Sequence, residues 1–248
     1  MTLDNEATVV FSEENDFSSY LTDIERREPL LHKFLATILK LINDKANWSL
    51  IQDACDSISF QEWDYDQYKE PFRFDSRSMK PDMTAFRLYK ECGDIDHMPV
   101  WVHGNGNCLF NSASMILVGN ELLALDLRVS TTIAMVKNCA DIQHSARSKG
   151  LDLVNGFDYI TELKNSATVT VFQSTFNVIA MCYALKASIF LLYPNSGVGL
   201  NNINALVNHG LMGGGSFKHK GYYIMWSGSK TDAYGWNHFV PLLIADRR

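Results

Sequence analysis

A cysteine that follows two glycines is the strongest chemical signal in the sequence. In Gly104-Asn105-Gly106-Asn107-Cys108-Leu109-Phe110, the glycines and asparagines let the backbone turn tightly and point successive N–H groups inward. Apolar residues recur at helical spacing after Cys108, so we expect this residue at a helix N-terminus. The partial positive charge of a helix end favours a thiolate, and its free N–H groups can stabilise an oxyanion.

A nucleophilic thiol needs a base, and the chain has seven histidines. His103 is close in sequence, but the tight loop between it and Cys108 does not ensure that it faces the thiol. His238 opens the apolar segment HFVPLLI, which is typical of a strand. A histidine at the start of a strand can project from a rigid sheet toward a helix N-terminus, as Cys–His catalysis requires. We therefore favour His238 as the base; the alternative is a partly buried histidine that only caps a strand.

The order of these segments resembles that of the OTU (ovarian tumour) cysteine proteases. The resemblance rests on GNGNCLF, on Leu127-Arg128 in the next expected helix and on NHFVPLL, and it covers about residues 97–246. It implies an α+β, papain-like core with a small central sheet flanked by helices. It also implies hydrolysis of isopeptide bonds after the C-terminal Gly-Gly of ubiquitin, so the implied partner is ubiquitin or polyubiquitin. No metal or other cofactor is implied.

The resemblance also implies roles for individual residues. Cys108 is the nucleophile and His238 the general base. The main-chain N–H groups of Asn105, Gly106 and Asn107, together with that of Cys108, form the oxyanion hole. Asn105 stands where the family usually has aspartate, and its amide can still shape the loop.

A second departure concerns the group that orients the histidine. Many members have Asn or Asp two residues after it, whereas Val240 at that position cannot accept a hydrogen bond from an imidazole. Another branch of the family uses an aspartate upstream of the cysteine. By that analogy Asp75, in FRFDSRS, is the first candidate, and Asp232 and Asn237 are the runners-up.

Three further expectations concern side chains near the predicted site. Trp236 is expected to line a channel for the Gly-Gly tail, to pack under the loop, or both. A narrow channel would select Gly-Gly, because any Cβ would clash there. Arg128 is expected to anchor its helix through a carboxylate. The remaining cysteines are expected to be structural.

The elements that must position these residues follow from apolar periodicity. Helices are expected from Pro29, over residues 48–58, after Cys108 as far as Gly119-Asn120, over 122–136 and from Ser174. Strands are expected over residues 100–102, 168–172, 188–193, 222–226 and 238–244. Because helices dominate the first part and strands gather at the end, the pattern predicts an α+β fold.

Composition narrows the class of protein. The chain has 248 residues, 46% of them hydrophobic, which is enough for a large core, and a net charge of −6 argues against nucleic acid as a partner. Five cysteines without a CxxC spacing predict neither a disulfide framework nor a zinc ribbon. The acidic N-terminus is unlike a signal peptide, and no apolar run approaches the roughly 20 residues that span a bilayer. We therefore expect a soluble protein of the cytoplasm or nucleus that makes no contact with membranes.

We expect three regions in the chain: a flexible acidic tail over 1–20, a helical N-terminal extension over 21–96 that is separate or part of the same domain, and an OTU-like catalytic domain over 97–248. Three functions stay open. They are an active thiol-dependent deubiquitinase, a catalytically silent OTU-like module that binds ubiquitin or another protein, and a thiol enzyme for another ubiquitin-like modifier. The residues do not indicate the ubiquitin linkage, the oligomeric state or the role of the N-terminal third.

Overall fold

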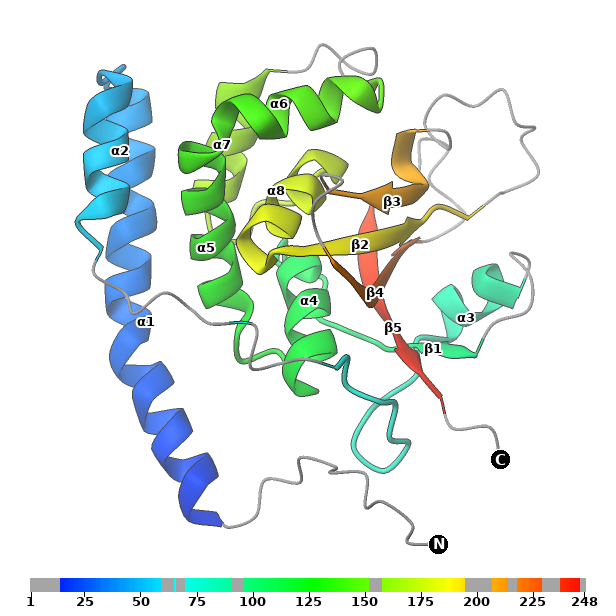
Figure 1. Ribbon diagram of the computed structural model, residues 1–248. Coiled ribbons are helices and arrows are strands. Elements are labelled where there is room, and N and C mark those ends of the chain that lie inside the picture. The colour runs from blue at the N-terminus through cyan, green and yellow to red at the C-terminus, as the bar shows by residue number, and fades with distance from the viewer. Residues whose placement is uncertain are drawn as a thin grey trace, which may run out of the picture.

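In the computed structural model of the chain, most helices lie on one side of a mixed sheet, and one short helix covers part of the other side (Figure 1). The structure describes residues 14–58, 65, 70–90, 96–151, 158–194, 207–213, 218–228 and 237–245. The helices are α1 (Glu14–Asn43), α2 (Trp48–Asp56), α3 (Met83–Lys90), α4 (Cys108–Val118), α5 (Ala124–Lys137), α6 (Cys139–Ser148), α7 (Tyr159–Ala167) and α8 (Thr175–Leu185). The strands are β1 (His97–Pro99), β2 (Ala187–Leu192), β3 (Gly210–Met212), β4 (Lys218–Ser227) and β5 (His238–Ile244).

The sheet has the strand order β1-β5-β4-β2-β3. Strands β2 and β4 run parallel, and the other neighbouring pairs are antiparallel. Strand β5 is covered on both faces, which explains why its sequence is apolar without interruption. Phe239 and Leu243 join the main core, whereas Val240 and Leu242 join a second cluster with residues of α3.

Helix α4 passes through the middle of the core. All of its residues are buried, and it packs against β5 and α5. It ends at Gly119, whose φ of 74° is left-handed. A Cβ at Gly119 would lie 2.6 Å from the Phe72 ring, so this helix end needs glycine for its conformation and for space. The end predicted at Gly119-Asn120 is confirmed.

The N-terminal helices share the core of the rest of the chain. The predicted stripe on α1, formed by Leu31, Leu35, Ile38 and Ile42, is buried in the same cluster as α4 and the sheet. Helix α1 packs against α5 and α7, and α1 and α2 lie side by side on the far side of α5 from the sheet (Figure 1). Helix α1 begins at Glu14, inside the segment expected to be a tail, and residues 1–13 lie outside the described part. The division into three regions stays a prediction.

The α+β class is confirmed, with a small mixed sheet, flanking helices and helices on the N-terminal side. Two strand predictions differ from the structure. The first strand is His97–Pro99 rather than 100–102, and Val100 forms only an isolated bridge to Pro81.

The second difference is at residues 168–172, which turn instead of extending. Thr170 has a φ of 68°, and the carbonyls of Thr168 and Val171 accept hydrogen bonds from the side chain of Arg128. Because a side chain takes these carbonyls, they are not available to a neighbouring strand. The β-rich sequence TVTVF therefore does not form a strand.

The shared core leads to a prediction about stability. Leu35→Ala should lower the free energy of unfolding by about 2–5 kcal/mol, because Leu35 is 1% exposed and its removal leaves a cavity. Denaturant unfolding followed by near-ultraviolet circular dichroism should still show a single transition. The matched control is Leu30→Ala in the same helix, where the side chain is 56% exposed and the change should stay within about 0.5 kcal/mol. Two separated transitions would instead indicate that the N-terminal helices unfold on their own.

Candidate active site

Cys108 is the first residue of α4, as the sequence predicts, and its side chain is only 2% exposed. The backbone N–H of Phe239, in β5, donates to its sulfur, as do the N–H groups of Leu109 and Cys108 itself. Burial raises the pKa of the Cys108 thiol, and these N–H groups and the charge of Arg128 lower it only in part. The helix end therefore does favour the thiolate, but burial outweighs it, which sequence reasoning did not foresee.

His238 begins β5 and pairs with Ser227. Its ring lies against the glycine loop: a Cβ at Gly104 would be 3.6 Å from both Cε1 and Nδ1 of His238. The ring donates a hydrogen bond to the carbonyl of Val102. Since the N–H of the next residue, Phe239, contacts the Cys108 sulfur, β5 brings both His238 and a direct contact with Cys108 to the start of α4.

Burial lowers the pKa of His238, and this effect is opposed by the charges of Asp82 and Glu121 and by the Val102 carbonyl. The ring is therefore neutral at pH 7 and can accept a proton. His103 has another partner, because its Nδ1 lies 2.8 Å from Oε2 of Glu121 and its backbone N–H donates to Oε1 at 2.9 Å. This contact leaves His238 as the better base of the two.

The loop from Gly104 to Asn107 is held by its own side chains. Oδ1 of Asn105 accepts from the N–H of Asn107 at 3.1 Å, and Nδ2 of Asn111 donates to the His103 carbonyl at 3.0 Å. The Asn105 side chain thus shapes the loop. Gly106 has a φ of 81°, and a Cβ there would lie 1.8 Å from the carbonyl oxygen of Thr170. Only glycine fits this close approach of two backbones.

Arg128 lies beneath this loop and is fully buried. Its Nε and Nη2 donate to Oδ1 of Asn107 at 3.0 and 2.8 Å, and Nη2 also donates to the Gly106 carbonyl at 3.0 Å. The other hydrogen bonds go to the carbonyls of Asn165, Ser166, Thr168 and Val171. The expected carboxylate anchor is therefore wrong for the contacts described here, which are to amide oxygens. Burial lowers the pKa of Arg128 to about 9, so it keeps its charge at neutral pH.

Asp75, the first candidate for orienting the histidine, forms a local turn. Its Oδ1 accepts from the N–H and Nε of Arg77 at 3.0 and 3.1 Å, and its Oδ2 accepts from Ser78 at 3.2 Å. These hydrogen bonds, with that from the backbone of Arg77 the largest, lower the pKa of Asp75. Asn237 is exposed, and Asp232 lies outside the described residues, as does Trp236. The orienting role of Asp75 stays a prediction.

Asp82 is a residue that sequence reasoning missed. It is 8% exposed, and its Oδ1 accepts from the N–H groups of Thr84 and Ala85, each at 2.9 Å, so it caps α3. Helix α3, which Asp82 caps, shares a buried cluster with Val240 and Leu242 of β5, the strand that begins with His238. Asp82 is also the first of the charges that act on His238. The sequence does offer one indication of this cap, because Asp82 directly precedes the short helix Met83–Lys90.

Phe172 is a second residue near the site that the sequence did not single out. Its ring stacks on Phe239 with centroids 5.7 Å apart and an interplanar angle of 7°, and it also contacts Trp226. Phe172 is 38% exposed, so it presents an apolar surface beside the strand that contacts Cys108.

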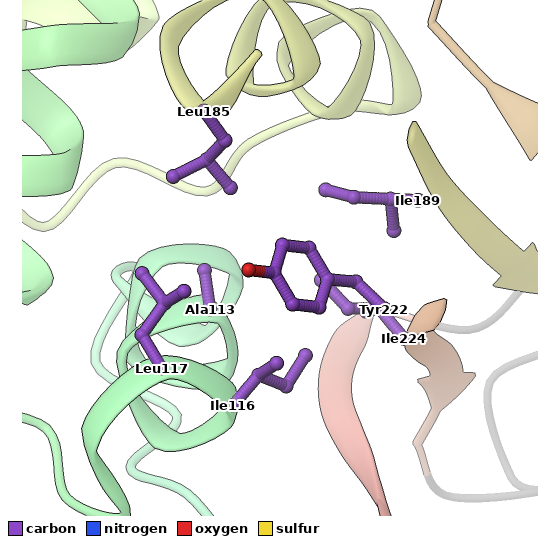
Figure 2. A pocket seen from close by; sticks show the side chains of 7 residues that line it. All are labelled: Ala113, Ile116, Leu117, Leu185, Ile189, Tyr222 and Ile224. Carbon is purple, nitrogen blue, oxygen red and sulfur yellow. The ribbon is translucent and has the colours of Figure 1, made fainter. Parts of the chain in front are cut away.

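Figure 2 shows the side chains around a narrow hollow between α4, α8 and the sheet, which has no room for a water molecule. The side chains around it are Ala113, Ile116, Leu117, Leu185, Ile189, Tyr222 and Ile224. They are nearly all apolar, so the hollow is packing space behind the nucleophile's helix and offers no groups for catalysis. Within the described residues, no cluster of His, Cys, Asp and Glu is arranged to hold a metal ion. No helix in the same residues has the length and apolarity needed to cross a membrane.

Comparison with known families matches residues 99–151 to the model described as "Vertnin, OTU domain". This match over about a fifth of the chain confirms the resemblance to the OTU family. Vertnin from Danio rerio is 24% identical over 135 residues, which cover 46% of this chain and 20% of that protein. Vertnin from Mus musculus is 22% identical over 189 residues, which cover 66% of this chain and 25% of that protein. The chain thus spans about a fifth to a quarter of the length of these curated relatives.

Solved OTU domains are distant structural likenesses. The viral OTU domain protease from Dera Ghazi Khan virus has a TM-score of 0.40 at 15% identity, with 60% of this chain and 82% of that chain covered. The OTU domain of OTUD1 has a TM-score of 0.40 at 14% identity, with 64% and 90% covered. The Hazara virus OTU bound to ubiquitin has a TM-score of 0.33 at 16% identity, with 61% and 83% covered.

The close approach at Gly106 gives a prediction. Gly106→Ala should lower the free energy of unfolding by about 1–3 kcal/mol, because the methyl group meets the Thr170 backbone and the left-handed φ disfavours alanine. Thermal or urea unfolding measures the change. Gly104→Ala is the control in the same loop, since its Cβ would only make ordinary contact with His238 at 3.6 Å. Equal stability of the two variants would show that the loop and the Thr170 backbone are not packed this closely.

Proposed function

We propose that the chain is a thiol-dependent ubiquitinyl hydrolase that cleaves isopeptide bonds after the C-terminal Gly-Gly of ubiquitin. Cys108 is its nucleophile and His238 its general base. The observation that carries the proposal is the role of β5, which starts with the histidine and donates the N–H of its next residue to the cysteine sulfur. The resemblance to OTU domains supports ubiquitin as the substrate class.

The proposed reaction begins from a neutral pair. Burial raises the pKa of the Cys108 thiol and lowers that of His238, so thiol and neutral imidazole are the resting state. His238 takes the thiol proton as the sulfur attacks the glycine carbonyl carbon. The N–H groups of Asn105, Gly106, Asn107 and Cys108 hold the resulting oxyanion, and for this the N–H of Asn107 must leave Oδ1 of Asn105. His238 then protonates the leaving lysine amine, and water, activated by the same ring, releases ubiquitin from the thioester.

The orientation of His238 is also part of the proposal. Asp75 is the residue favoured by analogy with one branch of the family, but its bonds to Arg77 and Ser78 support a local role. Support for Asp82 comes from its burial and its charge on His238. We propose that Asp82, together with the Val102 carbonyl, orients the imidazole.

Two side chains are proposed to contact the substrate. Phe172 offers apolar surface next to Phe239, where the aliphatic parts of an extended tail can pack. Trp236 precedes the His238 strand by two positions and keeps its predicted role in the Gly-Gly channel.

A second function has a specific observation in its favour. Cys108 is 2% exposed and burial raises its thiol pKa, features expected of an inert cysteine. The alternative is therefore a catalytically silent module that binds ubiquitin or another protein. The third possibility, a thiol enzyme for another ubiquitin-like modifier, differs only in the tail it accepts.

Labelling with ubiquitin that carries an electrophile at its C-terminus tests the nucleophile. We expect a covalent adduct, detected as a mass increase of the intact protein and located on Cys108. Cys108→Ala should abolish it. Cys139→Ala is the matched control, because Cys139 is a free, partly exposed cysteine outside the site. Reversible binding without an adduct would favour the silent module, and an adduct only with another modifier's tail would favour the third function.

A pair of substitutions tests the orienting residue. Asp82→Asn should lower kcat for a fluorogenic ubiquitin substrate by about tenfold or more, since an amide holds the imidazole less well than a carboxylate. Asparagine is also a good helix cap, so stability should change little. Asp75→Asn serves as the comparison and should retain most of the activity. A larger loss with Asp75→Asn would return the role to the residue that the sequence favours.

A further inference from the structure

The largest of the fully buried side chains in the described part of the chain carries a positive charge. Arg128 is 0% exposed. Burying a charge costs several kcal/mol unless hydrogen bonds compensate for it, and replacing a buried charge by an apolar side chain is often neutral or stabilising. Stability alone therefore does not explain why a charged side chain is buried at this position.

The hydrogen bonds of Arg128 join the loop before Cys108 to the end of α7 and the turn that follows it. On one side are Oδ1 of Asn107 and the carbonyl of Gly106, in the loop before Cys108. On the other are four carbonyls between Asn165 and Val171, at 2.8 to 3.1 Å. These two segments meet where Gly106 approaches Thr170. The planar fork of the guanidinium reaches both sides at once, which a lysine ammonium cannot do.

The side chain of Asn107 is committed to this contact. Asn107 stands at the N-cap of α4, yet its side chain makes no capping bond to the helix. Its Oδ1 accepts two hydrogen bonds from Arg128, at 3.0 and 2.8 Å. Arg128 therefore holds the side chain of the residue before Cys108, while the carbonyl of that residue accepts from the N–H of Asn111 in the helix.

The charge of Arg128 also acts on the nucleophile. The guanidinium lies over the Phe110 ring, 4.6 Å from its centroid, two residues after Cys108. Its described hydrogen-bond partners are all uncharged oxygens, so no carboxylate among them cancels its field. The positive charge lowers the pKa of the Cys108 thiol, against the larger effect of burial.

We propose that Arg128 is a positioning residue for Cys108: it holds the loop that presents the oxyanion N–H groups, and its charge favours the thiolate. This inference deepens the proposed function and rests on it for the role of Cys108 as nucleophile. A purely structural arginine would affect stability but would leave the ionisation of Cys108 unchanged once the variant is folded.

The charge is tested by titrating the thiolate of Cys108. The readout is the difference in absorbance at 240 nm between each protein and its Cys108→Ala counterpart, followed against pH. Arg128→Gln should lower the thiolate fraction about threefold at a fixed pH below about 9, where Arg128 carries its charge. Arg147→Gln is the matched control, because it removes one positive charge from the exposed face of α6. An unchanged thiolate fraction in folded Arg128→Gln would overturn the role of the charge.

The positioning role is tested with variants that keep a positive charge. Arg128→Lys and Asn107→Ala should each slow labelling by the ubiquitin electrophile about tenfold, while the thiolate fraction stays within about twofold of wild type. These two variants also decide the matter if Arg128→Gln does not fold. Labelling at the wild-type rate in both would overturn the positioning role. If the wild-type protein is not labelled at all, the proposed function fails, and the titration still tests the effect of Arg128 on the thiol.

Discussion

The hydrogen bonds of one buried guanidinium hold the site together. Arg128 donates to oxygens of the loop before Cys108, of the end of α7 and of the turn after it, and some of these oxygens also accept from Gln173 or Val171. A buried carbonyl left without a hydrogen bond costs about 1–3 kcal/mol of stability. Removal of the Arg128 side chain would therefore destabilise both segments. The start of α4, the tight contact at Gly106 and the turn that carries Phe172 all depend on it.

A rigid strand meets this loop from the other side. Strand β5 is buried on both faces, which fixes where it begins and hence where His238 lies. The same burial disfavours charge on both members of the proposed pair, because it raises the pKa of Cys108 and lowers that of His238. Packing therefore fixes the positions of Cys108 and His238, but burial disfavours a thiolate–imidazolium pair in the resting state. Fixed N–H groups and the charge of Arg128 offset this cost only in part.

Periodicity and turn residues predicted the elements that hold the site, but not the contacts that adjust it. These elements are the helix from Cys108 to Gly119, the stripe on α1 and the strand from His238. Each follows from residues close together in sequence, so it can be predicted without knowledge of tertiary contacts. TVTVF at 168–172 has strand propensity, yet its carbonyls bind Arg128, a partner from another helix. The burial of Cys108 and the position of Asp82 likewise depend on contacts distant in sequence, which a single sequence does not reveal.

The packing of α1 bears on any attempt to study the OTU-like part alone. The family match covers residues 99–151, whereas the core that supports this segment includes Leu31, Leu35 and Ile38. A chain shortened to begin near His97 would leave the apolar faces of α5 and α7 uncovered in water. Such a fragment would tend to self-associate, and a lack of activity in it would say more about the missing helices than about the chemistry of the cysteine.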